Sequence, residues 1–322
     1  MCYKACALRT AHAREQYMLP TRQGSIRLFQ LAGITVFLHW SWFLVAAYEI
    51  SDRKTNYSSV LWNMLEYLSL FLIVTMHEFG HSLACRSVGG RANQIVLWPL
   101  GGVAYVDPPP RPGAMLWSIA AGPLVNVVLF PLLSGVLWLG RSLGWPHSVP
   151  DAYQLLYAVW YINLALLVFN LLPVYPLDGG QILRSLLWFL MGRARSLMVA
   201  AVIGILGALG VAVLAVWGQS IWFGVIAAFI GMNCWRGLQQ ARALTTLAAA
   251  PRHQDFACPN CKAVPPQGAY WKCNRCGTAF DTFQTHAVCP KCGTQFDATR
   301  CAECGQLNPI SAWSLAVPVP PL

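Results

Sequence analysis

One pentapeptide in the N-terminal half of the chain has the residue types of a metal site. It is His77-Glu78-Phe79-Gly80-His81. On a helix, positions i and i+4 share a face, so both imidazoles can bind one zinc ion, with the glutamate as general base toward a metal-bound water. Ionisable groups at the end of a long apolar run are costly, which favours a functional role. The competing interpretation is a polar cluster at a helix end, stabilised by headgroups and water.

A catalytic zinc site needs a third protein ligand and an open position for water. Asp178 is the best candidate, because the segment 170–180 ends an apolar run and contains two prolines and two glycines. These residues break a helix and let the chain approach an ion. The run ends on the same membrane side as the histidine pair, as a shared ion requires. The alternative role for Asp178 is to cap the helix that follows.

Eight of the twelve cysteines form four CxxC pairs within 47 residues. Each pair places two thiolates on one tight turn, a spacing typical of zinc sites, and zinc thiolates imply a reducing compartment. Disulfide bonds of an extracellular domain suit these Gly- and Pro-containing turns less well. Spacing leaves crossed pairing open, but taking the pairs in order predicts two structural zinc ions, one bound by Cys258, Cys261, Cys273 and Cys276 and one by Cys289, Cys292, Cys301 and Cys304.

The composition excludes an ordinary soluble enzyme and a disordered chain. The 322 residues are 56% hydrophobic and 11% charged, where soluble domains carry about 25% charged residues, and the mean hydropathy is +0.48. We expect a polytopic α-helical membrane protein with about six transmembrane helices. A small membrane-associated β-hairpin is expected at Gln94–Asp107 and a partial helix at Gln181–Met191. The six apolar runs are Leu31–Ile50, Val60–Cys85, Ala114–Leu139, Tyr153–Leu172, Leu197–Trp217 and Ile221–Trp235.

The distribution of Lys and Arg predicts the orientation of these spans. Most of the basic residues outside the spans lie on the side of the N-terminal tail, whereas the opposite side has only Arg53, Lys54 and Arg141. By the positive-inside rule, both termini lie in the cytosol of a multi-pass protein of the cell (inner) membrane. An even number of spans and the reduced cysteine pairs agree with this orientation.

Three motifs together resemble the site-2 protease family of intramembrane zinc metalloproteases. Besides the pentapeptide, they are Gly122-Pro123-Leu-Val-Asn126 and the segment from Asn170 to Gly180 that contains Pro-Leu-Asp-Gly-Gly. The resemblance covers about residues 25–240. It implies that His77, His81 and Asp178 bind a catalytic zinc ion and that Glu78 is the general base. It also implies that Asn126 and Asn170 hold the substrate peptide or its oxyanion, and that the hairpin adds a strand to an unfolded substrate.

The expected domain organisation departs from the best-known members of this family. Neither a PDZ-like insertion nor a nucleotide-sensing domain is evident, and the cysteine-rich segment takes that place. We expect a cytosolic tail over residues 1–30, with Met18 as a candidate start, and a site-2-protease-like transmembrane domain over 31–240. A linker over 241–256, tandem four-cysteine zinc ribbons over 257–313 and a flexible tail over 314–322 complete the chain.

The leading functional hypothesis is a zinc metalloendopeptidase that cuts within or near a transmembrane segment of another membrane protein, in regulated intramembrane proteolysis. Its cofactors would be one catalytic and two structural zinc ions. Its partners would be the lipid bilayer, a substrate with a helix-weakened transmembrane segment, and a cytosolic protein bound by the ribbons. Nucleic acid is disfavoured, because residues 251–322 carry six basic and four acidic residues, a net charge of only +2.

Two other classes of function fit parts of the sequence. A catalytically silent membrane scaffold or adaptor would use the ribbons to recruit partners. A transporter with a metal site at a broken helix would explain the interrupted segment near Asp178, but not why Glu78 lies beside the first histidine. A Glu78→Gln substitution separates both from a protease, because neither a scaffold nor a transporter depends on a general base.

Overall fold

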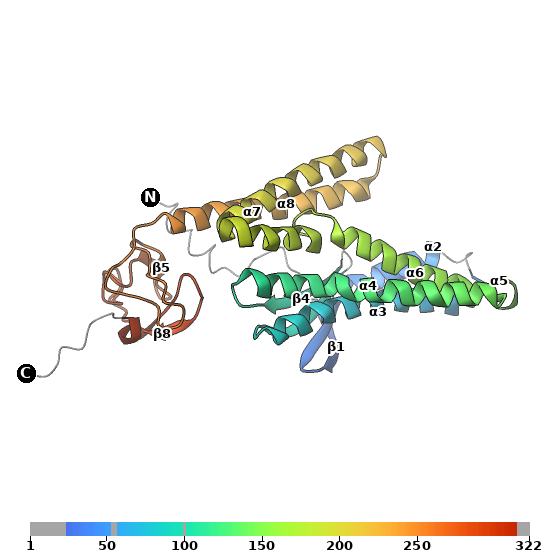
Figure 1. Ribbon diagram of the computed structural model, residues 1–322, viewed down its shortest axis with the longest axis horizontal. Coiled ribbons are helices and arrows are strands. Elements are labelled where there is room, and N and C mark those ends of the chain that lie inside the picture. Colours follow the sequence, from blue (N-terminus) through green and yellow to red (C-terminus); the bar gives the residue numbers. More distant parts are fainter. Residues whose placement is uncertain (1–23, 53–56, 99–100, 314–322) are drawn as a thin grey trace, which may run out of the picture.

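The computed structural model describes residues 24–52, 57–98 and 101–313. Most of the expected N-terminal tail, including Met18, and the expected C-terminal tail lie outside the described residues. Figure 1 shows an elongated molecule in which the hairpin of β1 (Ser25–Leu31) projects from a body of long helices, with a unit of short strands at one end beyond α8 (Ile221–Ala248).

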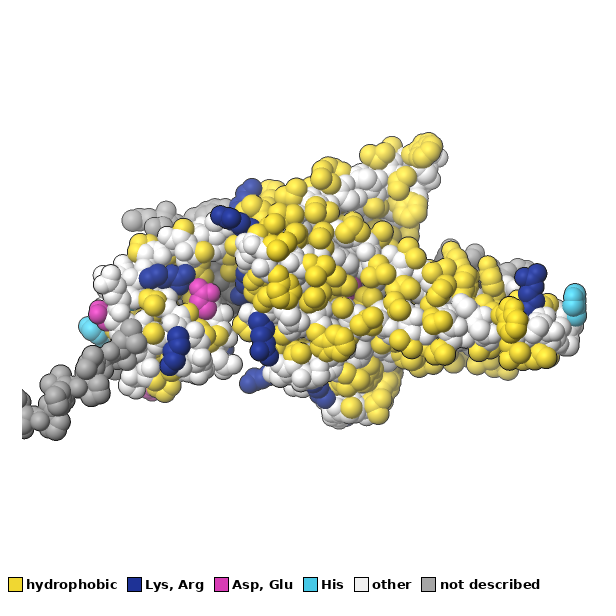
Figure 2. All heavy atoms as spheres, in the orientation of Figure 1, with side chains coloured by type: hydrophobic (Ala, Val, Ile, Leu, Met, Phe, Trp, Pro, Cys, Tyr) yellow, Lys and Arg dark blue, Asp and Glu magenta, His cyan; other side chains and the backbone are white. Residues whose placement is uncertain are grey.

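Long apolar helices form the body of the molecule. Among the described residues, five helices are long and apolar enough to cross a membrane, and their exposed side chains form a largely hydrophobic surface in Figure 2. This result confirms a multi-pass α-helical membrane protein. The five are α3 (Val60–Ser87), α4 (Pro112–Ser142), α6 (Pro150–Leu171), α7 (Asp178–Trp217) and α8 (Ile221–Ala248).

The first expected span is not one helix. Its residues form strand β2 (Ile34–His39) and the short helix α2 (Ser41–Asp52). The sequence Ile-Thr-Val-Phe-Leu-His is rich in β-branched and aromatic residues, which favour strands. Ile34 and Val36 are completely buried, so the strand has the protein contacts that non-helical backbone needs at membrane depth.

Strand β2 and helix α2 nevertheless run along the whole length of α3. Arg86, near the end of α3, donates a hydrogen bond to the carbonyl of Gly33 (2.9 Å), just before β2. Helix α2 ends at Asp52, only five residues before Tyr57, and α3 begins at Val60. The chain therefore passes from one end of α3 to the other, although a strand and a short helix replace the expected single helix.

The sheet has the order β1-β2-β3-β4 in the described part of the chain. Its outer pairs are antiparallel and the central β2–β3 pair is parallel. The pair β3–β4 confirms the expected hairpin, whereas β1 and β2 were not expected. Side chains of β2 and β3 pack against Val74 of α3. Strand β4 lies at one edge of the sheet, because it is the last strand in the order. The remaining strands are β1 (Ser25–Leu31), β3 (Arg91–Trp98) and β4 (Gly101–Asp107).

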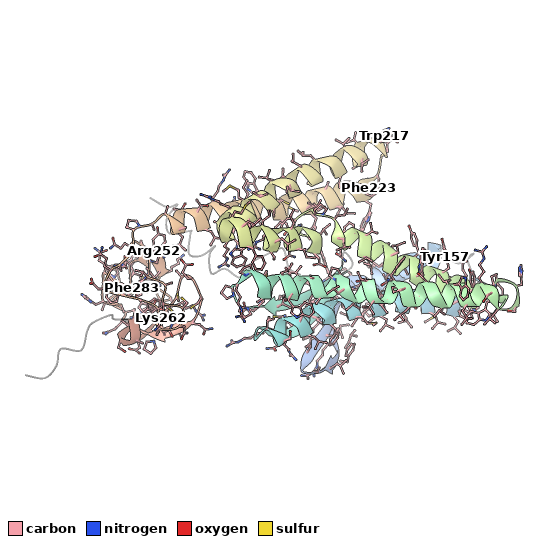
Figure 3. The ribbon with its side chains drawn as sticks, in the orientation of Figure 1. Tyr157, Trp217, Phe223, Arg252, Lys262 and Phe283 are labelled. Atoms are coloured by element: carbon pink, nitrogen blue, oxygen red, sulfur yellow. The ribbon has the colours of Figure 1, made fainter. Side chains whose placement is uncertain are left out.

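Helix α7 is interrupted rather than straight. Gly192 has a φ of 80° and a ψ of 170° inside the helix, a conformation that glycine adopts at little cost. The segment before this break corresponds to the partial helix expected at Gln181–Met191. The segment after it corresponds to the expected span Leu197–Trp217, whose end lies at the tip of the α7–α8 pair in Figure 3.

The cysteine-rich unit is built from two strand pairs and an aromatic core. Phe283 lies inside this unit in Figure 3, and its ring centroid lies 4.9 Å from that of Phe256 and 5.0 Å from that of Trp313. Helix α8 continues to Ala248, so the first half of the expected linker 241–256 is helical. The strands are β5 (Trp271–Lys272) with β6 (Ala279–Phe280) and β7 (Ala298–Arg300) with β8 (Leu307–Pro309), followed by the 3-10 helix η1 (Ile310–Trp313).

Candidate functional site

Three ligand atoms converge at the centre of the helical body. His77 and His81 lie one turn apart on α3, both are buried, and their Nε2 atoms are 3.1 Å apart. Asp178 begins α7, 101 residues further along, and its Oδ2 lies 3.0 Å from His77 Nε2 and 3.3 Å from His81 Nε2. The structure thus brings together the three residues that the sequence predicted as a ligand set.

The spacing of these three atoms fits a zinc ion. Zinc bound tetrahedrally to nitrogen and oxygen at about 2.0–2.1 Å has ligand atoms about 3.3 Å apart. The observed separations of 3.0–3.3 Å match this value. Two imidazoles and one carboxylate also leave one position open, which is the arrangement of catalytic rather than structural zinc sites.

The other ring nitrogen of each histidine is held by a fixed acceptor. His77 Nδ1 lies 2.6 Å from Asn126 Oδ1, and His81 Nδ1 lies 3.0 Å from the carbonyl oxygen of Ser118. With Nδ1 donating to these acceptors, each Nε2 presents its lone pair to the metal. Two residues of α4 therefore fix both the tautomer and the orientation of the rings.

Asn126 does not occupy the position expected for a residue that holds substrate. It is fully buried, its Oδ1 faces His77, and its Nδ2 donates to Asn163 Oδ1 at 2.8 Å. Both the oxygen and the nitrogen of its amide group are thus used within the protein, and Asn126 is better described as positioning His77. Asn163 donates in return to the backbone carbonyl of Asn126 (3.0 Å). The sequence analysis missed Asn163, although a polar residue inside the apolar run 153–172 was a usable signal.

Glu78 is held next to the histidines by the edge strand. Its Oε2 accepts a hydrogen bond from the backbone amide of Ala104 in β4 at 2.7 Å, and the side chain is buried. Gly102 of the same strand packs against it so closely that an added Cβ would lie 2.3 Å from Glu78 Cγ. Strand β4 therefore fixes the carboxylate that the sequence predicted as the general base.

The interrupted segment between α6 and α7 positions Asp178. Helix α6 ends at Leu171, and the chain folds so tightly that a Cβ at Gly179 would lie 2.3 Å from the carbonyl oxygen of Leu171. Tyr175 anchors the turn, because it is buried and its carbonyl oxygen accepts a hydrogen bond from Cys234 Sγ (2.9 Å). The prolines and glycines seen in the sequence thus allow this close approach.

An open cleft connects the ligand site with the surface. It has a volume of about 1690 Å³ and is lined by His77, Glu78, His81 and Asp178 at its inner end. Strand β4 and the prolines that follow it form one wall, and Asn170 lines the cleft as well. The site can therefore be reached by an extended chain.

The eight paired cysteines form two groups, but not in sequence order. Opposing Sγ atoms lie 3.6–3.7 Å apart, close to the separation of about 3.8 Å expected for tetrahedral zinc thiolates. Within one group, hydrogen bonding with Thr278 lowers the pKa of Cys276 to about 6, whereas desolvation raises the pKa of Cys289 to about 11. The expected sequential grouping is wrong, because the first group contains Cys258, Cys261, Cys301 and Cys304 and the second contains Cys273, Cys276, Cys289 and Cys292.

This nested grouping makes a prediction about metal content. We expect the double variant Cys261→Ser/Cys304→Ser to lose one zinc ion per chain, because both changes affect one site. The variant Cys261→Ser/Cys276→Ser should lose two. Sequential grouping predicts the reverse for both variants, so zinc analysis of the two purified proteins distinguishes the arrangements.

Comparison with known proteins agrees with this geometry. Residues 66–144 and 147–214 match the model of peptidase family M50. A zinc metalloprotease of Methanocaldococcus jannaschii is 38% identical over 180 residues, 56% of this chain and 50% of that protein. The stage IV sporulation protein FB of Bacillus subtilis is 32% identical over 124 residues, 38% of this chain and 40% of that protein. The chain spans about half the length of the curated relatives it matches.

A solved structure is similar as well. The site-2 protease from Methanocaldococcus jannaschii has a TM-score of 0.50 and 31% sequence identity, and the match covers 66% of this chain and 95% of that chain. The family model match ends at residue 214, before the cysteine-rich unit begins.

Proposed function

The chain belongs to peptidase family M50, and from this premise we propose that it is an intramembrane zinc endopeptidase. Its substrates would be membrane proteins that are cut within or near a transmembrane segment. The observation that carries the proposal is the meeting of His77, His81, Asp178 and Glu78 at the inner end of a cleft inside a body of apolar helices. We assign one catalytic zinc ion to the first three residues and two structural zinc ions to the cysteine groups.

Each residue of the site would have a separate role in peptide hydrolysis. When bound, a zinc ion lowers the pKa of a coordinated water to near 7 and polarises the scissile carbonyl. Glu78 accepts the proton that leaves the attacking water and passes it to the leaving amine. Its contact with the Ala104 amide holds one carboxylate oxygen in place, so the other serves as the acceptor. Asn126 keeps His77 oriented throughout.

The position of strand β4 supports the proposal that the substrate is bound in an extended form. An intact helix shields its carbonyl groups from attack, so the substrate must become extended before it is cut. As the edge strand beside Glu78, β4 can pair with an extended segment through its backbone. We therefore propose substrates with helix-weakening residues in the cut region, as in regulated intramembrane proteolysis.

Charge and chain path support an orientation with both termini in the cytosol. Figure 2 shows Lys and Arg side chains gathered where the cysteine-rich unit meets the helices, with a smaller group at the opposite tip. The composite first crossing by β2 and α2 keeps the number of crossings even. We propose that the ribbons and the mouth of the cleft face the cytosol.

Metal content and cleavage measured together test this function. We expect three zinc ions per purified chain, falling to two in His77→Ala/His81→Ala, because only the membrane site loses its ligands. Wild type should cut a single-span reporter whose helix is weakened by glycine and proline, and the variant should cut none.

Two results would contradict the proposal. If both proteins held two zinc ions and took up no further ion from added zinc, the catalytically silent membrane scaffold would be the better-supported function. A reporter cut equally by both proteins would show a contaminating protease.

A further inference from the structure

The outer wall of the catalytic cleft belongs to the cysteine-rich unit. Arg300 and residues 303–307 line the same cleft as His77, Glu78 and Asp178. These ribbon residues follow the ligand site by more than 100 positions in sequence. The cysteine-rich unit is therefore part of the path that any substrate takes to the site.

This wall is a fixed loop rather than a loose tail. Within the turn, the amide of Cys301 donates to the carbonyl of Gln306 (2.9 Å), and the amide of Gly305 donates to the carbonyl of Cys301 (3.0 Å). Cys301 and Cys304 belong to the first cysteine group. Arg252, at the joint with α8 in Figure 3, pairs with Glu303 at 3.3 Å. The first cysteine group and the Arg252–Glu303 pair together hold the loop over the cleft.

One side chain on this wall differs from the rest of the unit in being both hydrophobic and exposed. In the described residues after α8, Leu307 is the only large hydrophobic side chain that is exposed, with 58% of its surface accessible. The corresponding position after the second CxxC-Gly turn is Ala279, and after the third it is Gln295. An exposed leucine on a cleft wall suits contact with an apolar or mixed chain that passes through the cleft.

Strand β4 and the prolines after it form the opposite wall of the cleft, and they would direct a bound substrate toward Leu307. Strand β4 runs from beside Glu78 to Asp107, and Pro108, Pro109 and Pro110 continue the lining from its end. A segment that pairs with β4 at the site would leave along these residues. It would then pass between the prolines and the loop of residues 303–307.

We propose that the ribbon loop of residues 303–307 binds the extended cytosolic flank of the substrate and selects substrates by that flank. This inference rests on the proposed protease function and adds a second recognition site to it. Leu307 provides the apolar contact, while Arg300 and Glu303 border it with charge. The occupant is the substrate chain itself, because the loop lies on the same continuous cleft as the ligand site.

A leucine–glutamine exchange between equivalent turns tests the proposal. Full-length Leu307→Gln and the matched control Gln295→Leu would be assayed on two glycine- and proline-weakened single-span reporters, one with an extended cytosolic flank of twenty residues and one with the flank removed. We expect Leu307→Gln to raise KM about fivefold for the flanked reporter, as the loss of one half-buried leucine contact predicts. Its kcat, and both constants for the flankless reporter, should be unchanged, and Gln295→Leu should match wild type throughout.

A crosslinking experiment separates failure of this inference from failure of the protease function. A photoreactive phenylalanine would be placed at position 307 or 295 in full-length Glu78→Gln protein in membranes with the flanked reporter. We expect crosslinks to the flank from position 307 and none from position 295, whether or not the wild type cuts. Equal crosslinking from both positions, or an unchanged KM in Leu307→Gln, would overturn the flank site. Crosslinks from 307 without any cleavage by wild type would overturn only the protease function.

Discussion

Replacing Glu78 with glutamine should abolish cleavage while the membrane zinc site stays filled. The amide oxygen of glutamine can still accept the hydrogen bond from Ala104, so the side chain keeps its place beside β4. The amide cannot accept the proton of the attacking water, and removing a general base costs about 10²–10⁴-fold in rate. Because Glu78 is not among the three ligand residues, zinc content should remain at the wild-type value. Single-turnover cleavage of the reporter and zinc analysis of the same preparation measure both effects.

Glu66 offers a control on the same helix. It is also buried, but its carboxylate accepts a hydrogen bond from the Tyr57 hydroxyl (2.5 Å) rather than facing the ligand site. Glu66→Gln should therefore keep most of the wild-type kcat. If Glu78→Gln retained full cleavage, the proton acceptor would be another group. If it lost zinc, Glu78 would be needed for the metal site itself, and its role as base would need separate proof.

The ligand set was predictable because its chemistry is encoded locally. His77 and His81 share a helical face by their spacing, and the prolines and glycines around Asp178 mark a chain break that a metal site can use. Asn126 was harder to interpret. Its position in a motif was evident, but only the structure shows that its amide is used by His77 and by Asn163 of another helix.

The errors arose where tertiary contacts decide between local alternatives. An apolar run such as 31–50 fits a buried strand as well as a helix, and only pairing with β1 and β3 selects the strand for its first part. Likewise, a CxxC pair specifies half of a metal site. Which two halves meet depends on the fold, which joins the pair at Cys258 to the pair at Cys301. That Leu307 lines the cleft could not be predicted either, because it depends on how the cysteine-rich unit lies against the helices, which no local pattern contains.

Gly122→Ala should remove the membrane zinc ion without damaging the helix that carries it. Gly122 lies on α4 where an added Cβ would be 2.2 Å from His81 Nε2 and 2.8 Å from His77 Nε2. A methyl group would therefore occupy the space in which the two ligand atoms meet. Alanine is favoured over glycine inside a helix by about 1 kcal/mol, so the change should not unfold α4. We expect zinc affinity at this site to fall by about a hundredfold or more, and cleavage to fall with it.

Gly135→Ala, on the same helix, is the matched control, because a Cβ there would meet nothing within 4 Å. It should keep three zinc ions, full activity and the thermal stability of the zinc-loaded wild type or slightly more, whereas Gly122→Ala should be about as stable as wild type that lacks only the membrane zinc ion. Zinc analysis, reporter cleavage and melting temperature measured in parallel distinguish the outcomes. A Gly122→Ala protein that kept its zinc would require α4 to move away from α3. The hydrogen bonds of Ser118 and Asn126 to the histidines resist that movement, so the substitution tests whether α4 holds the ligand rings as rigidly as these contacts imply.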